Sequence, residues 1–296
     1  MQDTTNEKID TKRRENIAKI AGLATLTATM GLGGLNSMKA ESSEAPNINA
    51  ANTLANNAKS PFINEAYADS ERMMLPKVPM KLQRDSVGIV VVNPQIDFLS
   101  PKGIGWNIYG ASIKEHNTIE NIGLLFRVAK ALRLPIFVSY VVWNKQDLDI
   151  MPKTPMKNFI KGTGLALGKG SGLSANDIAN SGADFIPDFR PFILDNKTIL
   201  TTPRKDFGLN GSDLSAKLRT NGIKQVILCG MDANTHVDSH LRDLLADGFE
   251  VGVVRDGTAG AKLPEGDGYL AALINFRFLA NEMFYTKEVL QRLQNM

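Results

Sequence analysis

His236 and His240 are the residues whose types and spacing most directly suggest chemistry in this chain. On a helix, two residues four positions apart lie on one face, and a histidine pair with this spacing can bind zinc. A zinc site needs a third ligand at a fixed spacing, and none accompanies the pair. Cys229 is the single cysteine, which excludes an intramolecular disulfide and any multi-cysteine zinc site. We therefore expect no metal and no cofactor.

His236 also has the side chain whose pKa lies nearest neutrality, so it could act as a nucleophile or a general base. A helix is predicted from about His236 to Asp247, and the dipole at its N-terminus favours the neutral imidazole. A histidine base uses a carboxylate partner, and Asp97 and Asp232 are the candidates. Cys229 lies inside an apolar strand and is predicted to be a buried structural cysteine.

Short β-branched runs alternate with helical segments from Ser86 onward, which is the pattern of βαβ units. Strands are predicted at Val87 to Val92, Pro135 to Val142, Thr198 to Thr202, Gln225 to Gly230, Glu250 to Val254 and Glu282 to Thr286. Helices are predicted at Thr118 to Arg133, Ser212 to Asn221, His236 to Asp247 and Gly268 to Leu279, with a closing helix after the last strand. The predicted fold class is α/β, a doubly wound three-layer sandwich with a mainly parallel, six-stranded sheet.

Ligands of such sheets bind outside the carboxyl ends of the strands, so the site is expected in the loops after those strands. These loops follow Val92, Tyr140, Leu200, Gly230 and Arg255. No Gly-x-Gly-x-x-Gly follows the first strand, and a dinucleotide cofactor is therefore not expected.

Three segments at these strand ends carry a family resemblance. They are VVVNPQIDFLSPKG at 90–103, the stretch from Thr201 to Ala259, and GDGYLAALINFRFLAN at 266–281. Together they resemble the isochorismatase-like (cysteine hydrolase) superfamily over roughly Lys81 to the C-terminus. The resemblance implies a hydrolase whose Asp, Lys and Cys form a triad, with backbone amides as an oxyanion hole.

Carried over residue by residue, the triad is changed in this chain. The resemblance places His236 at the cysteine, Asn93 at the aspartate and Lys205 at the lysine, although another alignment places Thr202 at the lysine. Because an amide cannot take up a proton, the inherited mechanism cannot operate. The residues expected around the oxyanion hole and pocket are Ala233, Asn234, Thr235, Phe98, Trp106 and Phe207.

Three functions stay open on these residues. The first is a hydrolase of small amide, imide or vinyl-ether substrates with rewired chemistry at His236 and Lys205. The second is a catalytically silent pseudoenzyme that binds a small molecule or a partner, and the third is a metal-binding protein built on His236 and His240. The 34 Lys and Arg residues are scattered among 31 Asp and Glu, so no nucleic acid partner is expected. Oligomers are common for this fold type, and a homo-oligomer is expected.

The N-terminal 40 residues have the layout of a signal peptide. Arg13 and Arg14 precede a Gly- and Ala-rich apolar stretch from Ile20 to Leu35, which favours the twin-arginine route. This stretch is too short and too rich in glycine to span a membrane comfortably, so no membrane span is expected in the mature chain. An amphipathic or disordered tail is the alternative. Export to the periplasm or the extracellular space is the expected localisation.

Two further segments complete the predicted organisation. Residues 41–80 are interpreted as a flexible linker, and residues 81–296 as the hydrolase-like domain. Within that domain, 143–189 has no clear period and is predicted to be a cap-like insertion over the site. Lysines recur in the cap, where they could favour an anionic ligand or form a solvated basic face: Lys145, Lys153, Lys157, Lys161 and Lys169.

Overall fold

The computed structural model describes residues 75–76 and 78–296. The predicted signal peptide and most of the predicted linker lie outside the described residues, so the expectation of export stays a prediction. Within the described part of the chain, no helix is long and apolar enough to cross a bilayer.

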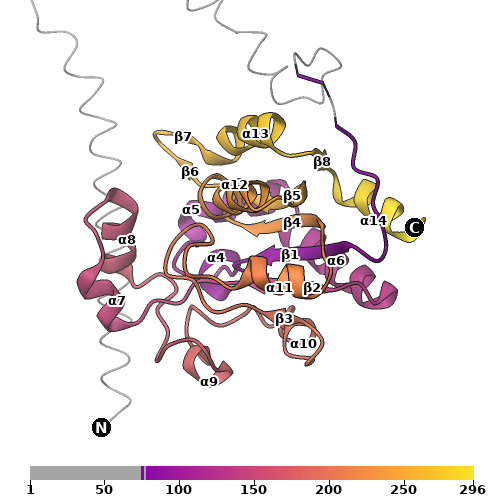
Figure 1. Ribbon diagram of the computed structural model, residues 1–296. Helices are drawn as coiled ribbons and strands as arrows, with labels where there is room; N and C mark the ends of the chain where they lie inside the picture. The colour runs from indigo at the N-terminus through magenta and orange to yellow at the C-terminus, as the bar shows by residue number, and fades with distance from the viewer. Residues whose placement is uncertain (1–74, 77) are drawn as a thin grey trace, which may run out of the picture. The chain divides into compact units, whose positions relative to one another are not determined.

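Six parallel strands form the central sheet, in the order β3-β2-β1-β4-β5-β8. The strands are β1 (Val87–Val92), β2 (Ile136–Ser139), β3 (Ile199–Leu200), β4 (Gln225–Met231), β5 (Glu250–Ala259) and β8 (Glu282–Phe284). All residues of β1, β2 and β4 are buried, and apart from Ser139 and Gln225 they are apolar or glycine, because helices cover both faces of the sheet. The predicted α/β fold with a six-stranded sheet is confirmed (Figure 1).

Helices lie on both faces of this sheet. Helices α5 (Trp106–Glu115), α6 (Thr118–Leu132) and α14 (Thr286–Gln294) pack together, as do α12 (Asp238–Ala246) and α13 (Gly268–Leu279). The connection from β1 to β2 leads toward one edge of the sheet, and the connection from β4 to β5 leads toward the other edge. Because both crossovers are right-handed, α6 and α12 lie on opposite faces. The remaining described elements are α4 (Ile96–Leu99), α7 (Lys145–Ile150), α8 (Pro155–Thr163), α9 (Ala175–Ile178), α10 (Arg190–Ile193), α11 (Leu214–Thr220), the π-helical turn η2 (Ala233–Val237), and the hairpin of β6 (Lys262–Leu263) and β7 (Gly266–Asp267).

The sequence-based boundaries differ from the structure mainly around the site. The strand predicted from Pro135 to Val142 ends at Ser139, because the backbone N–H of Val141 donates to the Gln95 side chain instead of continuing the ladder. The helix predicted from His236 begins earlier, as η2, and α12 continues it. Helix α5 was not predicted. The stretch 143–189 contains α7, α8 and α9, and its role as a cap stays a prediction.

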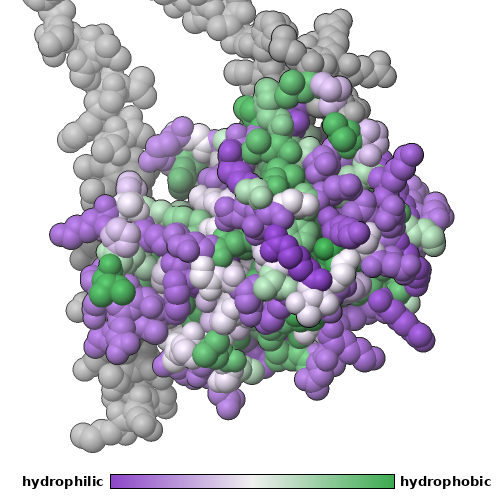
Figure 2. Space-filling model, viewed as in Figure 1, coloured by the Kyte–Doolittle hydropathy of each residue, from purple (hydrophilic) through white to green (hydrophobic). Residues whose placement is uncertain are grey.

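Hydrophobic side chains also gather on the surface. Over α13, the face seen in Figure 2 carries a hydrophobic area, and Ile274 and Phe278 of this helix are exposed by 36% and 64%. An apolar area of this kind is compatible with contact between subunits. The expected homo-oligomer nevertheless stays a prediction.

Candidate active site

The site lies where the strand order reverses, at the adjacent carboxyl ends of β1 and β4. Asn93 follows β1 and Asp232 follows β4, and both side chains are fully buried. Asn93 adopts a left-handed backbone conformation with φ of 46°, which asparagine tolerates better than most residues. Its N–H donates to the carbonyl of Ser139, the last residue of β2. The ends of three strands therefore meet at Asn93.

His236 and Asp232 form a buried pair at this point. His236 Nδ1 lies 2.5 Å from Asp232 Oδ1, and His236 is 3% exposed. Asp232 is the N-cap residue of η2, so its carboxylate also accepts from the Thr235 hydroxyl and, at 3.4 Å, from the His236 backbone N–H. Of the two carboxylate partners left open by the sequence, the structure places Asp232 beside His236.

Asp97, the other candidate, has a different environment. Its carboxylate accepts from the backbone N–H groups of Ile104 at 3.0 Å and Ala166 at 2.8 Å. These bonds connect the loop after β1 to the stretch 143–189. Gln95 does the same through its side-chain amide, which donates to Val141 at 2.8 Å and to Ala183 at 2.7 Å. Both residues support the loops around the site.

The electrostatics of the pair identify its protonation state. Burial lowers the pKa of His236 by more than the negative charge of Asp232 raises it. Burial raises the pKa of Asp232, but the charge of His236 and the hydrogen bonds from His236 and Thr235 outweigh this and leave it below its ordinary value. At neutral pH the pair is therefore a carboxylate and a neutral imidazole. A carboxylate only accepts, so Nδ1 carries the proton and Nε2 has a free lone pair.

Two predicted pocket aromatics surround the imidazole. The ring centroids of Phe98 and Phe207 lie 5.5 Å and 5.1 Å from that of His236, both with their planes nearly perpendicular to it. Tyr109 packs on Phe98, and burial together with the adjacent Asp232 raises the pKa of its hydroxyl well above the ordinary value. The His236 ring is therefore held in an aromatic environment of low polarity.

Arg204 is the cation of the site, and sequence reasoning missed it. It is fully buried, and its Nη2 donates to the Asn93 side-chain oxygen. Nε donates to the Ser139 hydroxyl at 2.9 Å, and Nη1 donates to the carbonyls of Asp206 and Phe207 at 2.7 Å and 3.1 Å. Burial lowers the pKa of Arg204 to about 9, against the opposing effect of Asp206 and Asp232, so it is charged at neutral pH.

The two sequence candidates for the lysine position have other partners. Lys205 is adjacent to Arg204, but its Nζ donates to the Val142 carbonyl at 2.6 Å and to Asp147 at 2.5 Å, and its side chain is 39% exposed. The backbone N–H of Thr202 donates to Asp213 at 2.8 Å. The structure thus brings Arg204, and neither candidate, against Asn93. The signal that could have identified it was its position between the two candidates, one residue from Lys205.

The predicted oxyanion segment forms the turn η2. Ala233 is buried, and Asn234 and Thr235 are partly buried. The Asn234 side chain accepts from the Ala261 N–H, and the Thr235 hydroxyl is bonded to Asp232, so both side chains support the loop. The first N–H groups of a helix have no intrahelical acceptor and can bind developing negative charge. The backbone of this turn is therefore suited to an oxyanion.

His240 lies one helical turn after His236, and both of its ring nitrogens form hydrogen bonds. Nδ1 donates to the His236 carbonyl at 2.6 Å, which leaves Nε2 to accept from the Ser139 hydroxyl at 2.9 Å. Ser139 in turn accepts from Arg204, so one chain of hydrogen bonds connects α12 to Asn93. These bonds leave His240 no lone pair for a metal. Within residues 75–76 and 78–296, no cluster of three or more His, Cys, Asp or Glu side chains could hold an ion.

The burial of His240 makes the stability of the protein depend on pH. Burial, with a smaller contribution from Arg204, holds its pKa well below the ordinary value. The stabilising contribution is complete above the unfolded-state pKa of about 6.5 and is lost as pH falls toward the folded-state pKa. Between pH 7 and pH 5 we expect the protonation of unfolded His240 to lower the free energy of unfolding by about 2 kcal/mol. Urea unfolding at both pH values would show this difference reduced in His240→Gln, and an unchanged difference would contradict it.

The sequence from residue 87 to 279 matches the family model of the isochorismatase domain, which covers β1 through α13.

The chain belongs to the isochorismatase family.

Solved structures of other proteins share the fold. A cysteine hydrolase from Pseudomonas syringae pv. phaseolicola is similar, with a TM-score of 0.61 at 16% identity over 75% of this chain and 99% of that one. An isochorismatase-like hydrolase from Alkaliphilus metalliredigens has a TM-score of 0.51 at 18% identity over 72% and 99% of the two chains. An isochorismatase family protein from Desulfovibrio vulgaris has a TM-score of 0.53 at 14% identity over 71% and 99%. Comparison with curated proteins gives no match.

In this isochorismatase-family chain, Asn93 and His236 follow the adjacent strands β1 and β4. The sequence resemblance is what assigns them to the family's aspartate and cysteine positions. Arg204 joins them through its bond to Asn93. Cys229 lies in β4 and is fully buried, and burial raises the pKa of its thiol. The thiol is therefore poorly suited to act as a nucleophile.

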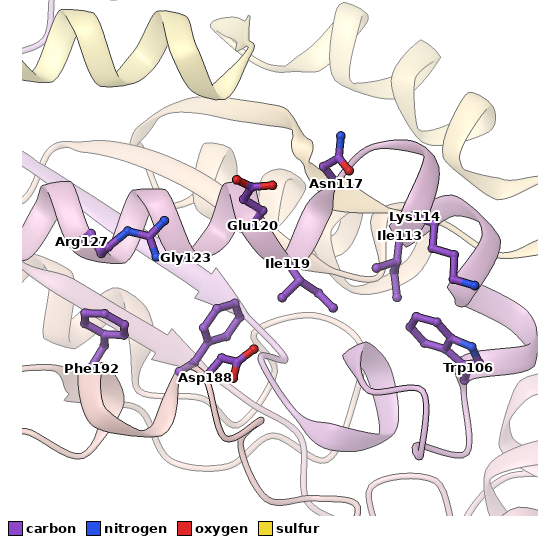
Figure 3. A pocket seen from close by; sticks show the side chains of 11 residues that line it. Trp106, Ile113, Lys114, Asn117, Ile119, Glu120, Gly123, Arg127, Asp188 and Phe192 are labelled. Carbon is purple, nitrogen blue, oxygen red and sulfur yellow. The ribbon is translucent and has the colours of Figure 1, made fainter.

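A groove of about 460 Å³ in this isochorismatase-family domain is lined by residues of α5 and α6 and by residues in and just before α10. Trp106, predicted to line the pocket of His236, lies at one end of this groove and Phe192 at the other (Figure 3). Arg127 and Glu120 of α6 are among the residues that line it. The residues that line the groove include neither His236 nor Asp232. Of the predicted pocket aromatics, Phe98 and Phe207 have ring contacts with His236 in the described structure.

Proposed function

We propose that this protein is a hydrolase of small amide, imide or vinyl-ether substrates in which a His236–Asp232 dyad replaces the family's cysteine-based chemistry. The observation that supports the proposal most strongly is the 2.5 Å contact between His236 Nδ1 and Asp232 Oδ1. A buried carboxylate that holds Nδ1–H orients the imidazole, and Nε2 is then available to accept a proton. His236 is thereby suited to general-base activation of water.

The remaining groups have roles in the same reaction. In the step proposed for an amide or imide, Nε2 takes a proton from water while the water oxygen attacks the carbonyl carbon. The N–H groups at the start of η2 stabilise the negative charge that develops on the substrate oxygen, and the buried guanidinium of Arg204 adds a favourable field. The imidazolium formed is stabilised by Asp232 and returns its proton to the leaving group. Asn93 holds Arg204 and takes no part in proton transfer.

A catalytically silent protein that binds a small molecule is the second candidate. It is favoured by the amide of Asn93, whose Nδ2 is buried without a hydrogen-bond partner in the described structure. An unpaired buried donor is costly, and a small polar ligand that accepts from it would remove this cost. Binding of such a ligand without turnover would give Asn93 Nδ2 its missing acceptor.

Turnover of a panel of small amides, imides and vinyl ethers by the purified protein separates the two candidates. The hydrolase proposal expects at least one substrate, with turnover reduced about 10²–10⁴-fold in His236→Ala. The matched control is His116→Gln, because His116 stacks on Tyr269 and has no contact with the dyad. Turnover that persists in His236→Ala contradicts the proposed role of the dyad. Binding of a panel member without hydrolysis supports the silent alternative.

A further inference from the structure

Lys157 is a buried cation beside the proposed active site. It belongs to α8 in the stretch 143–189 and is 7% exposed, whereas lysine is rarely buried to this extent. Its ammonium lies 4.4 Å from the ring centroid of Trp143 and 4.7 Å from that of Phe207. Cation–π contacts of this kind hold an ammonium in a defined position.

Phe207 connects this ammonium to the dyad. The same ring that lies under Lys157 also contacts the imidazole of His236. Burial is the main cause of the lowered pKa of His236, and the positive charge of Lys157 is a smaller one. A small molecule that reaches Nε2 of His236 past Phe207 would therefore come near this charge.

The hydrogen bonding of Lys157 leaves room for a further acceptor. An ammonium has three N–H donors, and the acceptor that the structure gives Lys157 is Asp206, at 3.3 Å. The Asp206 side chain is 49% exposed, so this ion pair is partly in solvent and weak. A carboxylate brought in by a ligand could bind the ammonium in a drier environment and with better geometry.

Helix α8, which carries Lys157, and the preceding helix α7 bury few side chains. Helix α7 contains no buried residue, and α8 buries Lys157, Ile160 and Thr163. In Figure 1 both helices lie at one side of the domain, away from the central strands. Segments with few buried apolar contacts open at low free-energy cost. Opening of α7 and α8 would expose the Lys157 ammonium and the Phe207 ring together.

We infer that Lys157 binds the carboxylate of a small substrate and so selects an amide, imide or vinyl ether that also carries a carboxylate. This inference rests on the proposed function, since it specifies the substrate class of the same site. The exposed lysines of the stretch 143–189, such as Lys153 and Lys161, do not share this position and are expected to be solvated. Of the two interpretations of these lysines that the sequence left open, the inference assigns the anionic ligand to Lys157 and the solvated face to the exposed lysines.

Equilibrium binding tests the inference without requiring turnover. The probes are small carboxylates from acetate to benzoate, each paired with its own primary amide, and binding is measured by calorimetry on the wild type and three variants. At least one carboxylate should bind the wild type more tightly than its amide and lose about tenfold or more in affinity in Lys157→Gln. Lys157→Arg should retain much of the preference. Lys161→Gln is the matched control on the same helix and should bind within about twofold of the wild type.

Equal binding of carboxylates and amides, an unchanged preference in Lys157→Gln, or no binding of any carboxylate would overturn the inference. Each variant's thermal unfolding without probe shows whether it is folded, and Lys157→Arg preserves the charge if the glutamine variant is not. A Lys157-dependent preference without any hydrolysis leaves the inference standing and removes the hydrolase proposal. His236-dependent hydrolysis of neutral amides that is unaffected in Lys157→Gln would support the hydrolase proposal and overturn the inference about Lys157.

Discussion

Replacing Asp232 with asparagine is expected to lower the turnover number by about 10²–10⁴-fold on whichever substrate the protein hydrolyses. The carboxylate accepts from His236 Nδ1–H and so keeps the lone pair on Nε2. An asparagine amide can donate to Nδ1 instead, which moves the proton to Nε2 and removes the base. The carboxylate's charge, which stabilises the imidazolium formed during the reaction, is lost as well.

Initial rates at saturating substrate measure this effect. Asp238→Asn is the matched control, because Asp238 follows directly in the same helical segment and pairs with the half-exposed Arg242 instead of with His236. This control should keep its turnover number within about twofold. Turnover of Asp232→Asn within about threefold of the wild type would mean that the dyad is not the base. A fall in both variants would instead indicate damage to the helix.

Replacing Arg204 with methionine is expected to lower the free energy of unfolding by about 3–5 kcal/mol. Methionine fills much of the volume, so the cost comes mainly from polar groups left without a donor. Asn93 Oδ1 and the Ser139 hydroxyl both accept from Arg204 in the buried interior, as do two backbone carbonyls. Each buried polar group without a partner costs about 1–3 kcal/mol, although relaxation recovers part of the sum.

Urea unfolding compares this variant with Lys205→Met, which makes the same chemical change one residue away. Lys205 is 39% exposed and pairs with Asp147 near solvent, so its replacement should cost no more than about 1 kcal/mol. Equal destabilisation by the two substitutions would contradict the assignment of Arg204 as the buried connection between β1, β2 and the dyad. A change in the slope of the free energy of unfolding against urea concentration would show that the compactness of the unfolded or native state had changed.

The sheet was predictable because its strands are local and strongly patterned. The run VGIVVV, predicted and observed as Val87–Val92, has no polar residue on either face. This pattern is typical of a strand that is covered on both sides. Helix α13 was likewise predicted with its observed bounds. Helix α5 was not predicted, because Gly105 precedes it and Gly110 and several polar residues interrupt the helical period of its apolar residues. The end of β2 was placed too late, since the Gln95 side chain, distant in sequence, takes the N–H of Val141.

The candidate site divides in the same way. The sequence by itself determined that His236 and Asn93 would follow strand ends, and parallel strands necessarily bring such residues to one edge of the sheet. Only the tertiary structure decided that Asp232 faces His236 and that Arg204 enters the interior while Lys205 faces solvent. The direction of each side chain depends on backbone conformation outside the regular elements and on partners distant along the chain. Neither leaves a periodic signal in the sequence.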